Sequence, residues 1–136
     1  MYKLIKTTFT TNEIVFTQNF IDEGQFKFIP KLTRKIGKIN DNNFYTDLIL
    51  KINNTDENPF PVNIKISFRA IFEFNDIDDQ KEVELFLKIQ AVHIMYPYLR
   101  SMLTNLTNTA MMPPLILPII DASQIFKNGD NDIRIN

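Results

Sequence analysis

The clearest pattern in the chain is a strict alternation of apolar and polar positions over residues 62–74. Polar side chains fill the intervening positions, with Ile71 as the exception. A period of two over this length predicts a β-strand with one buried face and one face open to solvent or a partner. Pro59 and Pro61 precede the strand, where a missing amide donor is tolerated. The apolar positions are Val62, Ile64, Ile66, Phe68, Ala70, Phe72 and Phe74.

Three upstream segments predict further strands of the same sheet. Residues 44–52 carry Leu and Ile on one face, and only a short polar turn separates them from residues 62–74, so the two predict an antiparallel hairpin. Residues 25–39 predict another strand, in which Pro30 indicates an edge or a bulge. The first sixteen or so residues predict one strand with a break near residues 10–12.

The period changes to a helical one after residue 74. Acidic residues come first, which is typical of a helix N-terminus because the helix dipole favours negative charge there. Pro97 has no amide proton, so we expect it to kink or end this helix and to start a second one that ends near Asn108. The polar residues 128–136 predict a frayed tail. The apolar positions at helical spacing are Val83, Phe86, Leu87, Ala91 and Ile94.

Strands followed by helix predict the α+β class. We expect residues 1–136 to form one domain, a four-stranded antiparallel sheet with a long kinked helix on one face. So thin a fold tends to bury its sheet edges and helix faces by oligomerisation. The second helix carries an apolar face at the spacing i, i+3, i+4 and i+7, which we assign to sheet packing and to an oligomer interface. That face consists of Leu99, Met102, Leu103 and Leu106.

Composition and charge exclude several classes of protein. The absence of cysteine excludes disulfides and thiolate chemistry and fits a reducing, cytoplasmic location. A net charge of −1 provides no basic footprint, so nucleic acid is not expected as a partner. The chain has neither the apolar core of a signal peptide nor an apolar stretch long enough for a membrane span, so no membrane insertion is expected.

Catalytic and metal sites are not expected either. His93 is the one histidine, and a zinc site without cysteine would need a carboxylate-rich cluster around it, so a structural role is favoured. No serine lies in a nucleophile-elbow sequence, and the glycines are too far apart to cradle a phosphate. The acidic residues 76–79 lack the glycine and closing glutamate of a calcium loop. The protein is therefore predicted not to be an enzyme and to need no cofactor.

The most informative stretch joins the helix to an apolar, proline-rich segment. Tyr96-Pro97-Tyr98-Leu99-Arg100 is followed by Ala110-Met111-Met112-Pro113-Pro114-Leu115-Ile116-Leu117-Pro118. The second segment is too short and too rich in proline to cross a membrane. It must therefore lie on a protein surface, either its own or that of a partner.

These two stretches resemble the SecB family of protein-export chaperones. The family has an aromatic-Pro-Tyr-Ala-Arg motif in its first long helix and then a loop of the type Gly-Thr-Phe-Pro-Pro-Leu-Asn-Leu-Ala-Pro. Here Leu99 replaces the small residue of the motif, and Met112 and Ile116 replace the Phe and Asn of the loop. Asp121-Ala122 is similar to the start of the family's last helix, and residues 2–9 are similar to its opening strand.

The resemblance implies an ATP-independent holdase that assembles as a dimer of dimers. Such a chaperone binds unfolded or extended polypeptide clients in long apolar grooves. Methionine and phenylalanine suit a promiscuous groove, because flexible thioethers and flat rings adapt to many side chains. The residues expected to contact clients are Phe16, Phe20, Phe26, Phe28, Met111, Met112, Leu115 and Leu117.

Two departures from the family bear on the role. The chain stops about ten residues after Phe126, so we expect the family's last helix, whose tail engages a translocase motor, to be short or missing. The loop Asn is replaced by Ile116. Both leave open whether the client is a secreted protein or a dedicated partner such as an antitoxin. The other functions left open are an oligomeric structural or adaptor protein of a mobile element and a carrier of a small apolar ligand.

Overall fold

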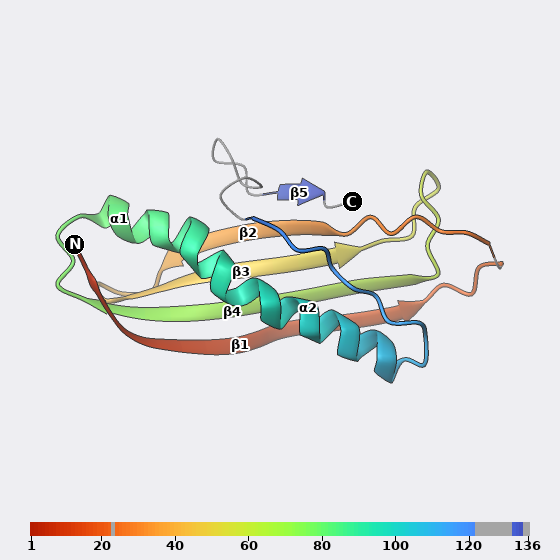
Figure 1. Ribbon diagram of the computed structural model, residues 1–136, viewed down its shortest axis with the longest axis horizontal. Helices are drawn as coiled ribbons and strands as arrows, with labels where there is room; N and C mark the ends of the chain where they lie inside the picture. Colours follow the sequence, from red (N-terminus) through yellow and green to blue (C-terminus); the bar gives the residue numbers. More distant parts are fainter. Residues whose placement is uncertain (23, 122–131, 135–136) are drawn as a thin grey trace.

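The computed structural model describes residues 1–22, 24–121 and 132–134. It confirms the predicted antiparallel sheet with a long helix across one face (Figure 1). The order of strands in the sheet is β1-β4-β3-β2-β5, and all strand pairs among the described residues are antiparallel. The strands are β1 (Lys3–Gln18), β2 (Lys31–Lys38), β3 (Asn43–Ile52), β4 (Val62–Asn75) and β5 (Asp132–Arg134).

The structure corrects three details of the predicted strands. The expected break in β1 is a register shift between Thr11 and Glu13, because an extra residue is accommodated as a bulge within one continuous strand. Residues 25–30 are not part of β2, whose first residue follows the buried Pro30. In the tail, residues 132–134 form the short strand β5 on the edge of β2 instead of fraying; the rest of the tail lies outside the described residues.

The alternating pattern of β4 forms the centre of the core, as predicted. All its apolar positions from Val62 to Phe74 are buried, and Phe72 and Phe74 make edge-on contacts with Phe86 of the helix layer. Such edge-to-face pairs add to the free energy gained by burying the rings. The partners on β3 that face the same way, among them Leu48 and Leu50, are fully buried.

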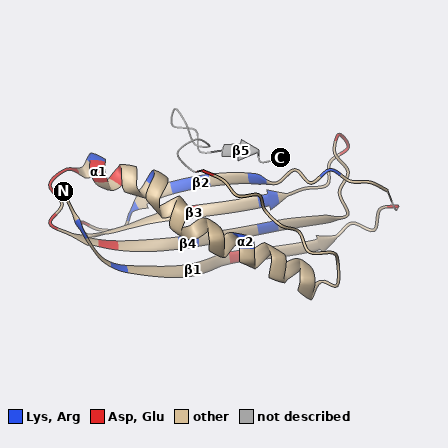
Figure 2. Ribbon diagram, in the orientation of Figure 1, with Lys and Arg blue, Asp and Glu red and all other residues tan. Residues whose placement is uncertain are grey.

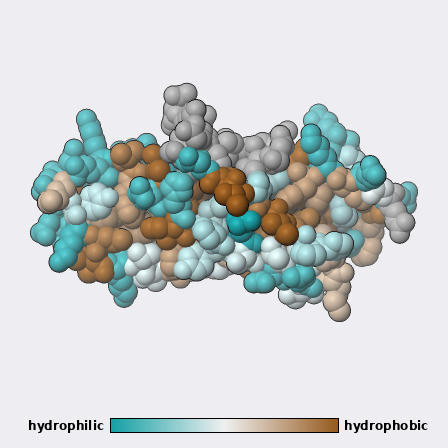
Figure 3. All heavy atoms as spheres, in the orientation of Figure 1, coloured by the Kyte–Doolittle hydropathy of each residue, from teal (hydrophilic) through white to brown (hydrophobic). Residues whose placement is uncertain are grey.

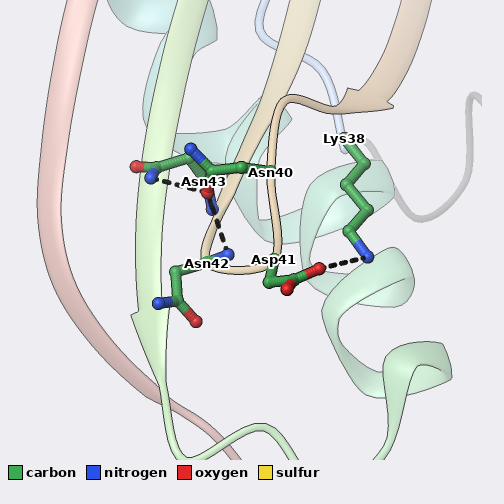
Figure 4. A network of polar contacts seen from close by, with 5 residues as sticks. All are labelled: Lys38, Asn40, Asp41, Asn42 and Asn43. Carbon is green, nitrogen blue, oxygen red and sulfur yellow. Dashed lines mark hydrogen bonds and ion pairs between the residues drawn. The ribbon is translucent and has the colours of Figure 1, made fainter.

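The β2–β3 hairpin turns on a cluster of asparagines (Figure 4). The Asn40 side-chain oxygen accepts hydrogen bonds from the amide N–H of Asn42 at 3.0 Å and from that of Asn43 at 2.9 Å. The Asn43 side-chain amide donates to the same oxygen. Lys38 forms an exposed ion pair with Asp41 across the turn, at 3.4 Å. This side-chain-to-backbone bonding fixes the turn and with it the register of the hairpin.

The helix layer comprises α1 (Gln80–Leu85), a π-helical turn η1 (Phe86–Gln90) and α2 (Ala91–Thr109). Asp79 caps α1 by accepting a hydrogen bond from the Lys81 amide, so the predicted acidic start is confirmed. Of the two outcomes expected at Pro97, a kink or an end of the helix, the structure excludes the end, because α2 runs through it. Pro97 is exposed, so water can solvate the carbonyl that loses its amide partner there.

Two sheet side chains anchor the π-helical turn. The buried Arg34 donates to the Lys88 carbonyl at 2.7 Å, and Thr46 donates to the Leu87 carbonyl at 2.8 Å. A π-turn displaces carbonyls from the regular helical pattern, and these donors satisfy them. Burial lowers the pKa of Arg34. The helix is thus fixed to β2 and β3 upstream of the segment that carries the candidate site.

Candidate functional site

Residues 113–121, here called the strap, run back along α2 (Figure 1). Four polar side chains of α2 bind the strap main chain: Tyr96, Arg100, Thr104 and Thr107. They are spaced three or four residues apart, which places them along one edge of the helix. An extended segment is thereby held antiparallel to a helix without a sheet partner of its own.

Two threonines bind one strap residue from both sides. The Leu115 amide donates to the Thr107 hydroxyl at 3.0 Å, and the Thr104 hydroxyl donates to the Leu115 carbonyl at 3.0 Å. The main chain of the strap is therefore satisfied at this point although it lies outside any strand.

Tyr96 and Arg100 hold the next part of the strap. The Tyr96 hydroxyl donates to the Pro118 carbonyl at 2.6 Å, and the Arg100 Nε donates to the Leu117 carbonyl at 2.9 Å. Burial raises the pKa of Tyr96 to about 12, with the nearby Arg100 charge acting in the opposite direction. The phenol therefore remains a hydrogen-bond donor well above neutral pH.

The turn between α2 and the strap exposes a methionine in an unusual conformation. Met111 has a φ of 62° and is 94% exposed. Its position follows the helix C-cap Ala110, where left-handed geometry usually selects glycine. Phe20, after β1, has a φ of 52° and is 88% exposed. Both residues combine backbone strain with an uncovered apolar side chain, a combination that recurs at binding sites.

The other predicted client contacts are more deeply placed. Phe26 and Phe28 are half-buried, and their rings pack against Phe60 with centroids 6.3 and 6.1 Å apart. Leu117 is fully buried and supports the strap from beneath. Three more residues are half-buried against the core: Phe16, Met112 and Leu115.

These residues gather mostly at one end of the molecule. In Figure 1 the C-terminal end of α2, with the turn that carries Met111, lies at the same end of the long axis as the end of β1. The segment with Phe20, Phe26 and Phe28 begins at that end of β1. The strap then leads away toward the middle of the sheet.

A furrow lies between the solvent side of α2 and the strap. Two shallow pockets of about 180 and about 270 Å³ share Pro97 and Arg100 as lining residues and so run into one another. The strap wall of the furrow is formed by Ile116 and Ile119, which are 61% and 87% exposed. Residues 92–105 of α2 span about 20 Å, the length of about six residues of extended peptide.

The sequence did not single out Ile116 and Ile119 as client contacts. For Ile116 the signal is the alternation along the strap, in which Leu115 and Leu117 turn inward and Ile116 turns outward. Ile119 is exposed against this alternation. That alternation has a meaning only once the strap is known to lie on the protein. Figure 3 shows apolar patches separated by polar atoms on the face that carries the helix and the strap.

The predicted interface residues of α2 lie against the sheet. Leu99 and Leu103 are fully buried within the chain, whereas Met102 and Leu106 are half-buried and keep some surface. Burial within one chain leaves no side-chain surface of Leu99 or Leu103 for a partner subunit.

A second apolar surface follows β1. Leu4, Phe9 and Ile14 face the helix side of the sheet and are exposed, and the Phe9 ring lies 4.9 Å from that of the exposed Tyr98. In the described part of the chain no strand pairs with the outer edge of β1. A long, unpaired edge beside exposed apolar side chains is typical of an interaction surface.

None of the described residues near the strap form a metal centre. The His93 Nε2 lies 3.8 Å from the Asp121 carboxylate, and both side chains are partly exposed. Within residues 1–22, 24–121 and 132–134, no three histidine or acidic side chains are grouped so as to hold a metal ion. None of the helices described is both long and apolar enough to span a membrane.

Comparison with known proteins places the chain in a family. Residues 12–132 match the family described as "Preprotein translocase subunit SecB". An uncharacterized protein of Methanocaldococcus jannaschii is 31% identical over 97 residues, which are 69% of this chain and 61% of that protein. The protein-export protein SecB of Orientia tsutsugamushi (strain Boryong) is 25% identical over 103 residues, 75% of this chain and 64% of that protein. The chain thus spans about three-fifths of the length of these relatives.

A solved structure shares the fold. The Mycobacterium tuberculosis SecB-like chaperone Rv1957, in complex with a ChAD peptide from the HigA1 antitoxin, superimposes with a TM-score of 0.68 at 13% identity. The match covers 88% of this chain and 90% of that one. The family match over most of the chain and this similarity of fold agree: the protein belongs to the SecB family.

Proposed function

We propose that this protein is an ATP-independent chaperone that holds non-native polypeptides in an extended form. The observation that carries the proposal is the furrow between α2 and the strap, with Ile116 and Ile119 exposed along its wall. Its length suits a short extended segment, and Met111 and Phe20 extend the apolar surface toward one end of the molecule. Relatives named protein-export protein SecB, and a structural neighbour that binds an antitoxin peptide, support it.

Capture in this proposal is passive. Apolar client side chains cover Ile116, Ile119, Met111 and Phe20, each of which contributes about 1–2 kcal/mol when removed from water. Four such contacts supply about 4–8 kcal/mol before the cost of ordering the client is subtracted, so a single furrow binds no more tightly than roughly micromolar. The function needs no catalytic residue, nucleotide or cofactor. Release then follows from weak, multiple contacts and not from a driven step.

We further propose that the protein works as a homo-oligomer, with a dimer of dimers as the expected form. The exposed residues Leu4, Phe9 and Ile14 and the unpaired edge of β1 are suited to self-association. Met102 and Leu106, which retain some surface on α2, are the members of the predicted interface that can reach a second copy. The strap side of α2 stays available for clients.

The proposed client class is a dedicated polypeptide such as an antitoxin, in the cytoplasm. The antitoxin peptide on the structural neighbour favours it, as does Ile116, which replaces the family's polar loop residue by an apolar contact. The alternative client class is that of secreted proteins in general export, in which case a translocase motor is a partner.

Suppression of aggregation tests the activity. The protein is mixed with an unfolded test protein at near-stoichiometric ratio without nucleotide, and light scattering is followed for several unrelated test proteins. The expected result is suppression by the wild type and its loss in Ile116→Ser/Ile119→Ser. A matched variant, Ile39→Ser, removes an exposed apolar side chain at the remote end of β2 and should retain activity.

The outcome separates the functions. Failure with every test protein, for a correctly oligomeric sample, contradicts the chaperone and favours the structural or adaptor protein. A small molecule that co-purifies and is seen by mass spectrometry would favour the apolar-ligand carrier. Equal loss in both variants would show that general hydrophobicity, and not the furrow, captures the clients.

A further inference from the structure

Four basic residues occupy one register position across the sheet. Lys65 of β4 pairs with Lys51 of β3, Lys51 pairs with Lys31 of β2, and Lys31 pairs with the Arg134 position of β5. Figure 2 shows the described part of this row as blue segments in line across β2, β3 and β4. We refer to Lys31, Lys51 and Lys65 as the basic row.

The basic row lies on the sheet face opposite the helix layer. Its members alternate with core residues along each strand, as Lys65 does with the buried Ile64 and Ile66. Like charges directly opposite one another on neighbouring strands destabilise a sheet. Lys51, at the centre of the row, therefore faces a like charge on each neighbouring strand, a cost in the isolated chain that an anionic counterpart would offset.

A cavity of about 730 Å³ adjoins the row and contains further charge. Lys27, Lys31 and Lys51 line it, together with Asp56 and Glu57 of the β3–β4 loop. Among the described residues, neither Lys27 nor Lys51 has a carboxylate within ion-pair distance, although two carboxylates share the cavity wall with them. At the β1 side of the row, Lys65 is paired with Glu13 at 2.7 Å.

We infer that the basic row and its cavity bind an acidic segment of a polypeptide partner. Strands lie about 4.8 Å apart, so the row spans about 10 Å across β4, β3 and β2. An extended peptide places every second side chain on one face, about 7 Å apart, so two carboxylates of an alternating acidic sequence fit within the span of the row. Asn53, Thr55 and Asn58 line the same cavity and suit peptide amides and carbonyls.

The surroundings favour a peptide over a nucleic acid. The chain has a net charge of −1, which gives no long-range attraction for a polyanion. Asp56 and Glu57 at the cavity would repel a phosphodiester backbone, whereas a peptide with spaced carboxylates and neutral residues between them can avoid both. The site is on the other face of the sheet from the furrow and does not rest on the proposed chaperone function.

Fluorescence anisotropy tests the inference. The probe is a labelled twelve-residue peptide in which Glu alternates with Ser or Gly, and the reference is the same peptide with Gln in place of Glu. At about 50 mM salt, where screening is weak, the Glu peptide should bind at least about tenfold more tightly. Lys27→Gln/Lys51→Gln should weaken its binding about fivefold. Lys3→Gln/Lys6→Gln removes the same amount of charge at the N-terminal end of β1. It should change the affinity for the Glu peptide by no more than about twofold.

Several results would overturn the inference. These are equal binding of the Glu and Gln peptides, equal losses in the two double variants, or tighter binding of a single-stranded oligonucleotide of the same charge. An unlabelled apolar client peptide should leave the anisotropy of the bound Glu peptide unchanged. Displacement by that apolar peptide would contradict a separate site, whatever the result of the aggregation assay.

Discussion

The Tyr96 hydroxyl donates a 2.6 Å hydrogen bond to the Pro118 carbonyl, and this contact fixes the strap to α2 beside the furrow. Tyr96 is buried, so the bond forms with little competition from water. Together with Arg100, Thr104 and Thr107, this phenol therefore sets the spacing of the two sides of the furrow.

Replacement of Tyr96 by phenylalanine should weaken the strap without disturbing the core. The ring is retained, but the hydrogen bond to Pro118 is lost, at a cost of about 1 kcal/mol in the free energy of unfolding. Urea unfolding followed by circular dichroism measures it. A destabilisation of less than about 0.3 kcal/mol would mean that the bond does not form in solution.

The raised pKa of Tyr96 makes stability depend on alkaline pH. The folded chain holds the phenolic proton with a pKa of about 12, against the ordinary value of 10.0. The stabilisation is complete below pH 10 and is lost as the pH rises through the folded-state value, by up to about 1.4 kcal/mol per pH unit. The difference in unfolding free energy between wild type and Tyr96→Phe should therefore change between pH 10 and 12. A constant difference over that range would contradict a buried, neutral phenol.

The two threonines should control how firmly the strap is held. Thr104→Val/Thr107→Val keeps the shape of both side chains but removes the hydrogen bonds to Leu115. We expect faster amide exchange and faster proteolytic cleavage in the strap. Thr109→Val is the matched control, because Thr109 bonds within the helix to Asn105 and does not touch the strap. Equal cleavage in both variants would place the effect in the helix and not in the strap.

Gly37 should tolerate alanine only if Tyr45 is shortened. A Cβ at Gly37 would collide with the Tyr45 ring, which is itself held under the Arg69 guanidinium at 4.0 Å. Gly37→Ala should cost about 1–3 kcal/mol in the wild type, measured by urea unfolding. In a Tyr45→Ala background the same substitution should cost well under half of that. Equal costs in the two backgrounds would show that the ring moves aside freely.

A charge on the apolar surface of β1 should reduce assembly. Ile14 is exposed on the helix side of this edge strand, and Ile14→Lys would place an ammonium group within any interface formed there. Light scattering should report a smaller particle for the variant than for the wild type. Thr10→Lys, on the opposite face of the same strand, serves as the control. A particle of unchanged size for Ile14→Lys would show that the subunit interface does not include this surface of β1.

Local pattern was sufficient to predict β4 and the β3–β4 hairpin. There the alternation of Ile64, Ile66 and Phe68 reports a buried face directly. The same reasoning did not decide between a kink and an end of the helix at Pro97, because the cost of proline in a helix depends on whether the freed carbonyl meets water, and exposure is a property of the fold. The pattern predicted the bulge in β1 only as a break in the strand near residues 10–12.

The candidate site depended more heavily on tertiary structure. Met111 and Phe20, which are predicted to contact clients, are exposed. Leu117, which is predicted with them, turns inward and Ile116 outward, and only the path of the strap decides this. The basic row could not be predicted either. Lys31, Lys51 and Lys65 lie in three separate segments, and their alignment follows from the register of three strands.

Photo-crosslinking tests the central claim, capture of extended polypeptide in the furrow, most directly. An apolar client peptide with a benzophenone group is bound and irradiated, and the labelled residues are identified by mass spectrometry. The account predicts crosslinks concentrated on residues 92–105 and 111–119, and their reduction in Ile116→Ser/Ile119→Ser. Crosslinks confined to β1 or to the basic row, at full occupancy of the peptide, would contradict it.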